Sequence, residues 1–497
     1  MSNIQVEGQY KDEQFDNSDS SILSYNKENS PLFTLYPDLY NAIFEQKRNV
    51  LISGIGGTGK TYSLNLIRSE CDKLGIKCDV TSTTGISAHA IKGSTIHRFS
   101  GIKLGKKPLA TILSDIKSRK DIVKAWKTAE ILIIDEVSML GANTLTLINN
   151  VAQNIRYGSL VSKKNKDKNK PFGGIQVIFS ADFLQLPPVN DEFCFKSPVW
   201  NSLHLFNFRM IHPYRYPDLN HFQMLSRFRV GKFTDEDIEL LKTRIKEYDI
   251  YKQKERWGQI TDDIKPTRIY SLNRDVETIN MQELERLEGD LNVYECNDVF
   301  VPKKKEGYKV HEYTDYMDNI AEREIYLKPG AQVMLTTNLD VESGLTNGSR
   351  GVVMECGDNS ITVKFKNGNI IPIIPYPYEH EDDDVIIVRH QFPLRLASSY
   401  SIHKSQGATL DYAIIDLGTS LFCPALGYVA LSRCRTLEGL FIVNIVPSKI
   451  KADPEALEFE EKLILDSITA KKIGDNPDII KSPSEHKEGD EDCNQPI

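Results

Sequence analysis

The chain has 497 residues, enough for about two to four domains, and its 40% apolar and 26% charged residues are ordinary for a soluble globular protein. No apolar run reaches the ~18 residues of a membrane span, and the acidic first 30 residues exclude a secretory signal and argue against an Arg-rich transit peptide. The net charge of −8 comes from the two ends, with −4 in residues 1–30 and −5 in residues 475–497, so global charge permits a nucleic-acid partner but does not indicate one.

The two ends also differ in composition from the rest of the chain. Residues 1–30 are rich in Asn, Asp, Ser and Glu, and we expect a disordered acidic tail there. Residues 451–497 are expected to form a C-terminal helix followed by a second acidic, disordered tail. Any protein partners are expected at these tails, and the sequence leaves their identity open. Eight scattered cysteines without a CxxC pair argue against disulfides or zinc and favour an intracellular location, in the nucleus if the source is eukaryotic.

The first predicted strand, residues 49–53, leads into a glycine-rich loop and then an amphipathic segment. The loop, Gly54 to Thr61, matches G-x-x-x-x-G-K-[ST], in which backbone N–H groups surround the phosphates of a nucleotide. Lys60 is expected to reach the β- and γ-phosphates and Thr61 to bind Mg²⁺. The competing interpretation is a glycine-rich turn that happens to precede Lys-Thr. The predicted nucleotide-binding residues are Gly54, Gly56, Gly57, Thr58, Gly59, Lys60 and Thr61.

A second apolar strand, residues 129–135, ends in adjacent carboxylates. Asp135 is expected to hold Mg²⁺, through water, and Glu136 to orient and deprotonate the attacking water. Alone, this pattern is as typical of a strand that ends at the solvent-exposed surface as it is of a catalytic site. Its position 75 residues after Lys60 favours the catalytic interpretation.

Two further residues could contact the γ-phosphate. Gln185 follows the apolar strand at residues 175–180, and its amide can touch both the attacking water and the phosphate; the alternative is a turn stiffened by Pro187 and Pro188. Arg433 lies far along the chain, where it could act as an arginine finger from a second domain. Spacing alone does not distinguish it from a surface arginine.

The alternation of short strands and helical segments predicts an α/β fold with parallel sheets covered on both faces. A second alternation begins near residue 267 and resumes at residues 412–417 and 440–445. Between these lie short strands at residues 352–355, 360–365 and 369–374, separated by Gly-Asp-Asn and Asn-Gly turns. They predict a small all-β insert.

Several motifs together resemble the petite-integration-frequency DNA helicases, of the RecD-like branch of helicase superfamily one. They occur in the family's order over about residues 49–445. The motifs are residues 81–99 (TSTTGISAHAIKGSTIHRF), 134–140 (IDEVSML), 181–189 (ADFLQLPPV), 330–335 (GAQVML), 346–351 (TNGSRG), 401–409 (SIHKSQGAT) and 428–435 (YVALSRCR). Residues 145–156 also resemble the family's signature helix. The family's usual Gly-Asp is Ala181-Asp182 here.

The resemblance implies two RecA-like domains that form an ATP cleft, with a small wedge subdomain and a small β-barrel insert. We therefore expect a first RecA-like domain at residues 31–200, with the wedge at about 100–125. The second is expected at residues 201–450, with the barrel at about 350–390.

The resemblance also implies roles for individual residues. Lys60, Thr61, Asp135, Glu136 and Gln185 keep the roles argued above, Arg433 matches the arginine finger, and Arg215 matches a second γ-phosphate arginine. The residues that match DNA-contacting motifs are Thr84, Thr95, His97, His403 and Lys404. Such side chains suit hydrogen bonding to DNA phosphates, although each histidine could instead be a satisfied core residue.

These observations predict an ATP- and Mg²⁺-dependent DNA helicase in genome maintenance. It would translocate 5′→3′ on single-stranded and forked DNA, without a membrane partner. One alternative is an ATP-driven translocase with little unwinding. Another is a non-catalytic single-strand binding protein, against which the intact set of Lys60, Asp135, Glu136 and Arg433 argues.

Overall fold

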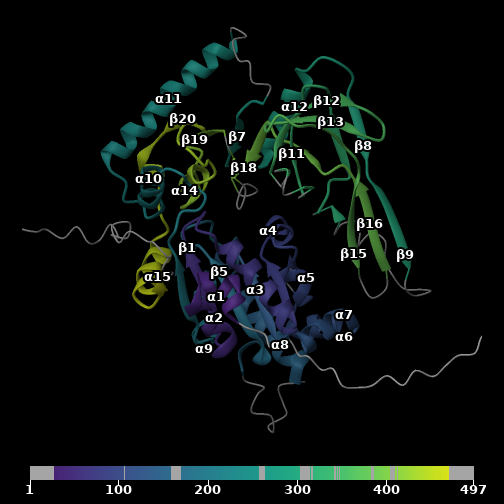
Figure 1. The fold of residues 1–497 in the computed structure, drawn as a ribbon, viewed down its shortest axis with the longest axis vertical. Coiled ribbons are helices and arrows are strands. Elements are labelled where there is room, and N and C mark those ends of the chain that lie inside the picture. The colour runs from purple at the N-terminus through teal and green to yellow at the C-terminus, as the bar shows by residue number, and fades with distance from the viewer. Residues whose placement is uncertain are drawn as a thin grey trace, which may run out of the picture.

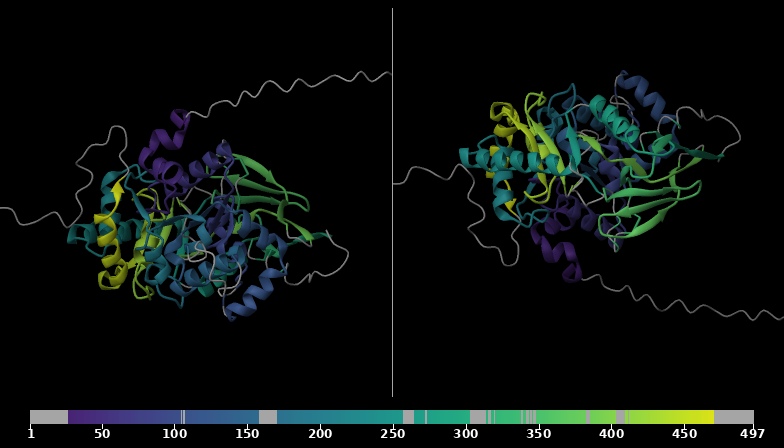
Figure 2. Two further views of the ribbon diagram at one scale, coloured as in Figure 1. Left: turned by 90° about the horizontal axis from the view of Figure 1, so that it is seen from below. Right: turned by 90° about the horizontal axis from the view of Figure 1, so that it is seen from above.

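Two parallel sheets form the centre of the molecule, with an antiparallel part beside them (Figures 1 and 2). The computed structural model describes residues 27–469 apart from residues 104, 106, 158–169, 257–263, 272, 303–313, 315, 316, 319, 338, 341, 342, 344, 346, 347, 382–384, 403–408 and 411. The predicted α/β class is confirmed. No helix in the described part of the chain is long and apolar enough to cross a membrane.

The first sheet has seven parallel strands in the order β21-β6-β1-β5-β4-β2-β3. Alternate side chains of its strands enter two different cores, because successive residues of a strand point to opposite faces. The strands are β1 (Val50–Gly54), β2 (Cys78–Ser82), β3 (Ser94–Thr95), β4 (Ile131–Asp135), β5 (Gln176–Ala181), β6 (Phe206–Met210) and β21 (Ile468–Thr469).

Helices cover both faces of this sheet, as the near-continuous apolar strands require. On one face lie α1 (Pro31–Leu35), α2 (Pro37–Tyr40), the π-helix η2 (Asn41–Glu45) and α3 (Lys60–Leu74). On the other face lie α5 (Ile96–Ser100), α6 (Leu109–Lys117), α7 (Lys120–Thr128), η3 (Val137–Met139), α8 (Ala142–Tyr157), η5 (Pro171–Gly174), η6 (Cys194–Lys196), α9 (Pro198–Ser202) and α15 (Pro454–Leu465). The remaining short helices of this half are η1 (Lys27–Asn29) and α4 (Gly85–Ala90).

The second sheet has four parallel strands in the order β18-β7-β19-β20. They are β7 (Thr267–Tyr270), β18 (Ser399–Ser401), β19 (Ala413–Leu417) and β20 (Leu440–Ile445). The helices of this part are α10 (Leu219–Arg229), α11 (Asp235–Arg256), α12 (Asn273–Glu285), α14 (Leu426–Leu431) and η7 (Pro447–Lys449). Residues of α10, α11 and α14 share one apolar core with the strands.

The three strands of the predicted all-β insert are β12, β13 and β14, and they belong to a larger antiparallel part whose three sheets begin at residue 292 and project to one side of the molecule (Figure 2). A five-stranded sheet contains β11 (Gln332–Leu335), β12 (Arg350–Cys356), β13 (Ile361–Phe365), β14 (Ile370–Ile373) and β17 (Leu394–Leu396). Smaller sheets contain β9 (Asn297–Pro302), β15 (Tyr376–Glu381) and β16 (Val385–Gln391), and β8 (Asn292–Glu295) and β10 (Glu324–Leu327). No pairing among the described strands joins β14 to β17, so closure into a barrel stays a prediction.

The chain returns to the first sheet after it has built the second. The helix α15 packs on the first core, and β21 pairs with β6 at the sheet's edge. The first sheet therefore contains strands from beyond residue 200. The domain boundaries given above, and the wedge assigned to the region of α6 and α7, stay predictions.

Candidate functional site

The glycine-rich loop joins β1 to α3 at the edge of the first sheet, and residues that come after this sheet's strand β6 in sequence approach it. β1 ends at Gly54 and α3 begins at Lys60. Gly57 and Gly59 have φ values of +89° and +91°, a region that side-chain-bearing residues rarely adopt. A Cβ on Gly57 would also lie 2.7 Å from Cβ of Arg215. Glycine is therefore required both by the turn and by the close approach of Arg215.

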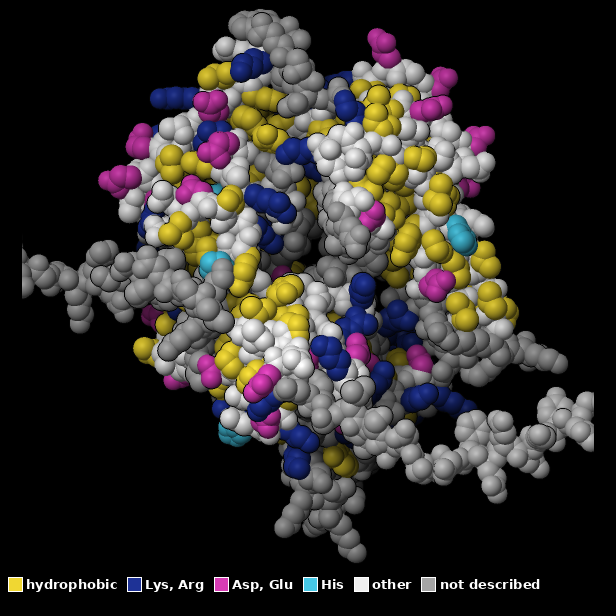
Figure 3. Space-filling view, viewed as in Figure 1, with side chains coloured by type: hydrophobic (Ala, Val, Ile, Leu, Met, Phe, Trp, Pro, Cys, Tyr) yellow, Lys and Arg dark blue, Asp and Glu magenta, His cyan; other side chains and the backbone are white. Residues whose placement is uncertain are grey.

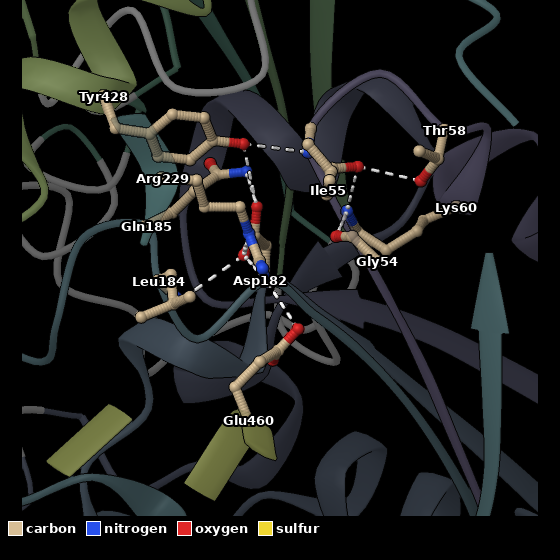
Figure 4. A network of polar contacts seen from close by, with 11 residues as sticks. Gly54, Ile55, Thr58, Lys60, Asp182, Leu184, Gln185, Arg229, Tyr428 and Glu460 are labelled. Atoms are coloured by element: carbon tan, nitrogen blue, oxygen red, sulfur yellow. Dashed lines mark hydrogen bonds and ion pairs between the residues drawn. The ribbon is translucent and has the colours of Figure 1, made fainter. Parts of the chain in front are cut away.

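The loop is held in shape by its own hydrogen bonds (Figure 4). Lys60 Nζ donates to the carbonyl oxygens of Gly54 at 2.7 Å and Ile55 at 3.2 Å, and Thr58 Oγ1 donates to Ile55 at 2.8 Å. Burial lowers the pKa of the Lys60 ammonium, against the nearby carboxylates. Thr61, in the first turn of α3, is exposed. The loop is thus a preformed turn with a half-buried cation and an accessible hydroxyl.

The carboxylates at the end of β4 lie at the same edge of the first sheet as the loop, because β1 and β4 both pair in parallel with β5. Asp135 is 4% exposed, and burial raises the pKa of its carboxyl. Its Oδ1 accepts a hydrogen bond from the Glu136 backbone N–H at 2.9 Å. Glu136 has a left-handed φ of +53°, and hydroxyls of β2 and the following turn fix this corner: Ser82 Oγ donates to the Asp135 carbonyl at 3.2 Å and Thr83 Oγ1 to the Glu136 carbonyl at 3.0 Å. Non-glycine residues in this conformation concentrate at functional sites.

Gln185 lies beside the loop, as predicted. Its side chain is buried, and Nε2 is 3.1 Å from the position that a Cβ on Gly56 would occupy. The same nitrogen donates to Asp182 Oδ2 at 3.0 Å. The amide is thus held beside the glycine-rich loop.

The two predicted arginines converge from different parts of the chain. The Arg215 backbone N–H donates to the Gly57 carbonyl at 3.1 Å, and its Nη1 donates to the Ser432 carbonyl at 3.4 Å. Arg433 is 1% exposed, so it is not a surface arginine. Its Nε donates to the Val429 carbonyl at 2.8 Å and its Nη2 to Ser432 Oγ at 2.6 Å. Burial, together with the charge of Arg215, lowers the pKa of Arg433 to about 10.

The predicted DNA-contacting residues of the first half lie at the ends of β2 and β3. Thr84 Oγ1 accepts the Ser87 backbone N–H at 3.2 Å, and Thr95 Oγ1 accepts the Arg98 backbone N–H at 3.3 Å. Both threonines therefore cap short helices. His97 is half-buried in α5, and burial lowers its pKa. These residues follow the two strands that lie beyond β4 in the sheet, because β2 pairs with β4 on one side and with β3 on the other.

His403 and Lys404, the corresponding residues of the second half, lie outside the described residues, as do Thr346 and Asn347 of another quoted motif. Their placement stays a prediction. Figure 3 shows lysine and arginine side chains bordering the hollow at the centre of one face of the molecule.

Four polar residues outside the predicted set join the site into one network. Asp182, Arg229, Tyr428 and Glu460 are linked by hydrogen bonds that reach Gly56 of the loop (Figure 4). Asp182 and Tyr428 stand in quoted motifs, so their positions beside Gln185 and Arg433 were a signal. Arg229 and Glu460 carried none, because their partners are remote in sequence.

Two families of known sequences match the chain. Residues 31–236 match the PIF1-like helicase family, and residues 316–356 match the 2B domain of the DNA helicase Pif1. The second match covers β10, β11, β12 and the segments between them.

Individual relatives agree with these matches. The chain is 34% identical to the ATP-dependent DNA helicase PIF1 of Xenopus laevis, over 84% of this chain and 62% of that protein. It is 33% identical to the human protein of the same name, over 83% of this chain and 61% of that protein. The chain thus spans less than two thirds of the length of these relatives.

Several solved structures have a similar fold, and the match with this chain covers nearly the whole length of each of them. A Pif1 helicase from Candida albicans has a TM-score of 0.68 at 28% identity, over 88% of this chain and 99% of that one. A Bacteroides Pif1 in complex with ADP-AlF4 has the same TM-score and identity, over 86% and 96%. A Bacteroides Pif1 bound to single-stranded DNA has a TM-score of 0.57 at 27% identity, over 87% and 96%. The parallel sheets described above are therefore a RecA-like core.

Proposed function

Because the chain belongs to the PIF1-like helicase family, we propose that it is an ATP-dependent DNA helicase that moves 5′→3′ along single-stranded DNA and unwinds duplex or structured DNA. The observation that carries the proposal is the meeting of Gln185, Arg215 and Tyr428 on the glycine-rich loop. A nucleotide on this loop would contact groups from the halves built on the two parallel sheets. Its binding and release can therefore change the position of one half relative to the other.

The residues of the first sheet would bind and activate the nucleotide. Lys60 and the backbone N–H groups after Gly54 would hold the β- and γ-phosphates. The hydroxyl of Thr61 and the carboxylate of Asp135 would hold Mg²⁺, since magnesium prefers a few protein oxygens supplemented by phosphate and water. The ion would neutralise the charge that develops on the phosphates. Glu136 would accept the proton of the attacking water, which Gln185 would orient.

Residues beyond the first sheet would sense the γ-phosphate. Arg215 already lies on the loop, and Arg433 lies one residue from Ser432, which accepts a hydrogen bond from Arg215. Both arginines would stabilise the charge of phosphoryl transfer. Loss of that charge after hydrolysis would release them.

The DNA track would run past both halves. Thr84, Thr95 and His97 would contact DNA phosphates in the first half, and His403 and Lys404 in the second. We propose single-stranded and forked DNA as partners, with genome maintenance in replication, repair and recombination as the setting. We also propose that the protein acts in the nucleus and that protein partners bind its acidic tails.

The deciding experiment measures ATP hydrolysis with and without single-stranded DNA, then unwinding of duplexes with a 5′ or a 3′ tail. We expect DNA-stimulated hydrolysis and opening of 5′-tailed duplexes only. Binding should weaken steeply with salt, because phosphate contacts release counterions. Opening of 3′-tailed duplexes alone would contradict the polarity, and hydrolysis without opening of any forked duplex would favour a translocase with little unwinding.

A further inference from the structure

Asp182 is the most heavily bonded carboxylate near the loop. It directly follows β5, is 1% exposed, and accepts five hydrogen bonds (Figure 4). Oδ1 accepts from Arg229 Nε at 2.9 Å, Arg229 Nη2 at 2.7 Å and the Leu184 backbone N–H at 3.3 Å. Oδ2 accepts from Gln185 Nε2 at 3.0 Å and the Tyr428 hydroxyl at 3.2 Å. One buried anion therefore fixes side chains from three segments.

The network extends in both directions from Asp182. The Tyr428 hydroxyl accepts the Gly56 backbone N–H at 3.2 Å, which connects α14 to the glycine-rich loop. Arg229 Nη2 also donates to Glu460 Oε1 at 2.7 Å, which connects α10 to α15. A continuous polar path thus joins the loop to the C-terminal helix.

Stability does not explain why these charges are buried. Removing two carboxylates and a guanidinium from water is costly, and apolar replacements are often as stable. The helix α15 already docks through apolar side chains, including Ala456 and Leu463. Burial opposes ionisation of Asp182, yet Arg229 and Lys60 hold the pKa of its carboxyl below the usual value. Asp182 therefore stays a charged acceptor of fixed position.

We propose that Arg229 and Glu460 are positioning residues of the ATP site. They hold Asp182, which in turn holds the Gln185 amide and the Tyr428 hydroxyl against the loop. This inference rests on the proposed ATP hydrolysis. It means that the C-terminal helix, which the sequence placed outside both RecA-like domains, takes part in hydrolysis without touching the nucleotide.

The first test replaces Glu460 by glutamine, which keeps the shape and removes the charge. We expect kcat for DNA-stimulated ATP hydrolysis to fall about 10- to 100-fold, the scale of small misplacements in an active site. The Kd of a fluorescent ATP analogue should change less than about twofold, because Glu460 does not touch the loop. The matched control is Glu458→Gln, two residues away on the exposed side of α15, where Glu458 pairs with Lys462. That variant should keep wild-type kcat.

A second measurement separates positioning from a merely structural role. In a Gln185→Ala background, Glu460→Gln should lower kcat by a smaller factor than in the wild type, because one of the two groups through which it acts is gone. Multiplicative losses in the double variant would overturn the inference, as would wild-type kcat in Glu460→Gln.

A third variant decides the matter if Glu460→Gln does not fold. Tyr428→Phe removes only the hydroxyl between Gly56 and Asp182, and kcat should again fall with Kd kept. Tyr378→Phe is its control, because that buried hydroxyl bonds to Thr336 in the β insert. Wild-type kcat in Tyr428→Phe would overturn the inference. An inactive wild-type protein would overturn the proposed function first, whereas active wild type with unaffected variants would overturn this inference alone.

Discussion

Single charged side chains at the start of α3 and at the ends of β4 and β5 are wholly or partly withdrawn from water. Asp135 and Asp182 are buried and Lys60 is half-buried within one small region, and desolvation shifts the pKa of Lys60 down and that of Asp135 up. Each shift favours the neutral form, so bound phosphates or metal would restore the charge. Groups arranged in this way are typical of catalytic sites.

Two substitutions test the roles of these residues. Lys60→Ala should abolish hydrolysis, because the β- and γ-phosphates lose their cation. Glu136→Gln should keep nucleotide affinity yet stop turnover, because it removes the base and leaves the strained backbone with a side chain of equal size. Turnover and titration with a fluorescent nucleotide provide the measurements. Near-normal turnover in Glu136→Gln would remove Glu136 from the base role.

A pH dependence follows from His221. It is buried in α10 against the ring of Tyr216, and burial lowers its pKa, although Asp218 and Glu438 act in the opposite direction. Below pH ~6.5 the unfolded chain binds a proton that the folded chain lacks. The free energy of unfolding should therefore fall with decreasing pH, by at most about 1.4 kcal/mol per pH unit from this residue.

Denaturant unfolding between pH 8 and pH 5.5 measures this loss. The loss should be smaller in His221→Gln, whose side chain does not titrate, than in the wild type. Equal losses in the two proteins would show that His221 does not contribute.

At the scale of elements, α15 and β21 anchor the end of the described chain to the first sheet. Phe459 of α15 stacks on Phe195, with ring centroids 4.0 Å apart, and meets the rings of Phe183 and Trp200 edge-on. Beyond the helix, β21 extends the sheet outside β6. The C-terminal helix is thus part of the first core.

Phe459→Ala should destabilise this anchor. We expect a loss of about 2–3 kcal/mol, below the ~3–5 kcal/mol of a fully buried phenylalanine because Phe459 is only partly buried. Chemical unfolding followed by tryptophan fluorescence reports the change, since Trp200 contacts the ring. Leu465→Ala, at an exposed position of the same helix, should change stability by less than about 0.5 kcal/mol. A similar effect of both substitutions would contradict the anchoring role.

At the scale of the whole molecule, the site exists only where the two parallel sheets meet. The Tyr216 hydroxyl donates to the Ser432 carbonyl at 2.9 Å, so the segment after β6 contacts the end of α14 directly. The loop of the first sheet and the arginines beyond it therefore form one unit. A change at the nucleotide can be transmitted to the second sheet through these contacts.

Arg433→Ala tests this coupling. We expect hydrolysis to fall by about 10³-fold, the scale of arginine fingers, with nucleotide affinity largely kept. Single-turnover hydrolysis and nucleotide titration measure the two quantities. Normal hydrolysis in this variant would place Arg433 outside the catalytic site.

Local sequence determined the parts of the molecule that depend on short-range patterns. The strand, glycine-rich loop and helix from Val50 to Leu74, the strand ending at Asp135 and the hairpins around β13 were all predicted, because periodicity and turn residues act over a few positions. The resemblance of motifs added the family. The positions of Gln185 and Arg215 beside the loop could be expected for the same reason.

Only the tertiary structure decided which distant residues share a carboxylate or a sheet edge. Asp182 and Glu460 both bind Arg229, and β21 pairs with β6. Glu460 lies more than 200 residues from Arg229 in the sequence, and β21 lies more than 200 residues from β6. No local pattern marks such pairs, because a buried ion pair needs only complementary charge and a suitable position in space. The sequence alone therefore determined the fold class, the family and the phosphate-binding loop. The three-dimensional packing determined that the C-terminal helix borders the same site.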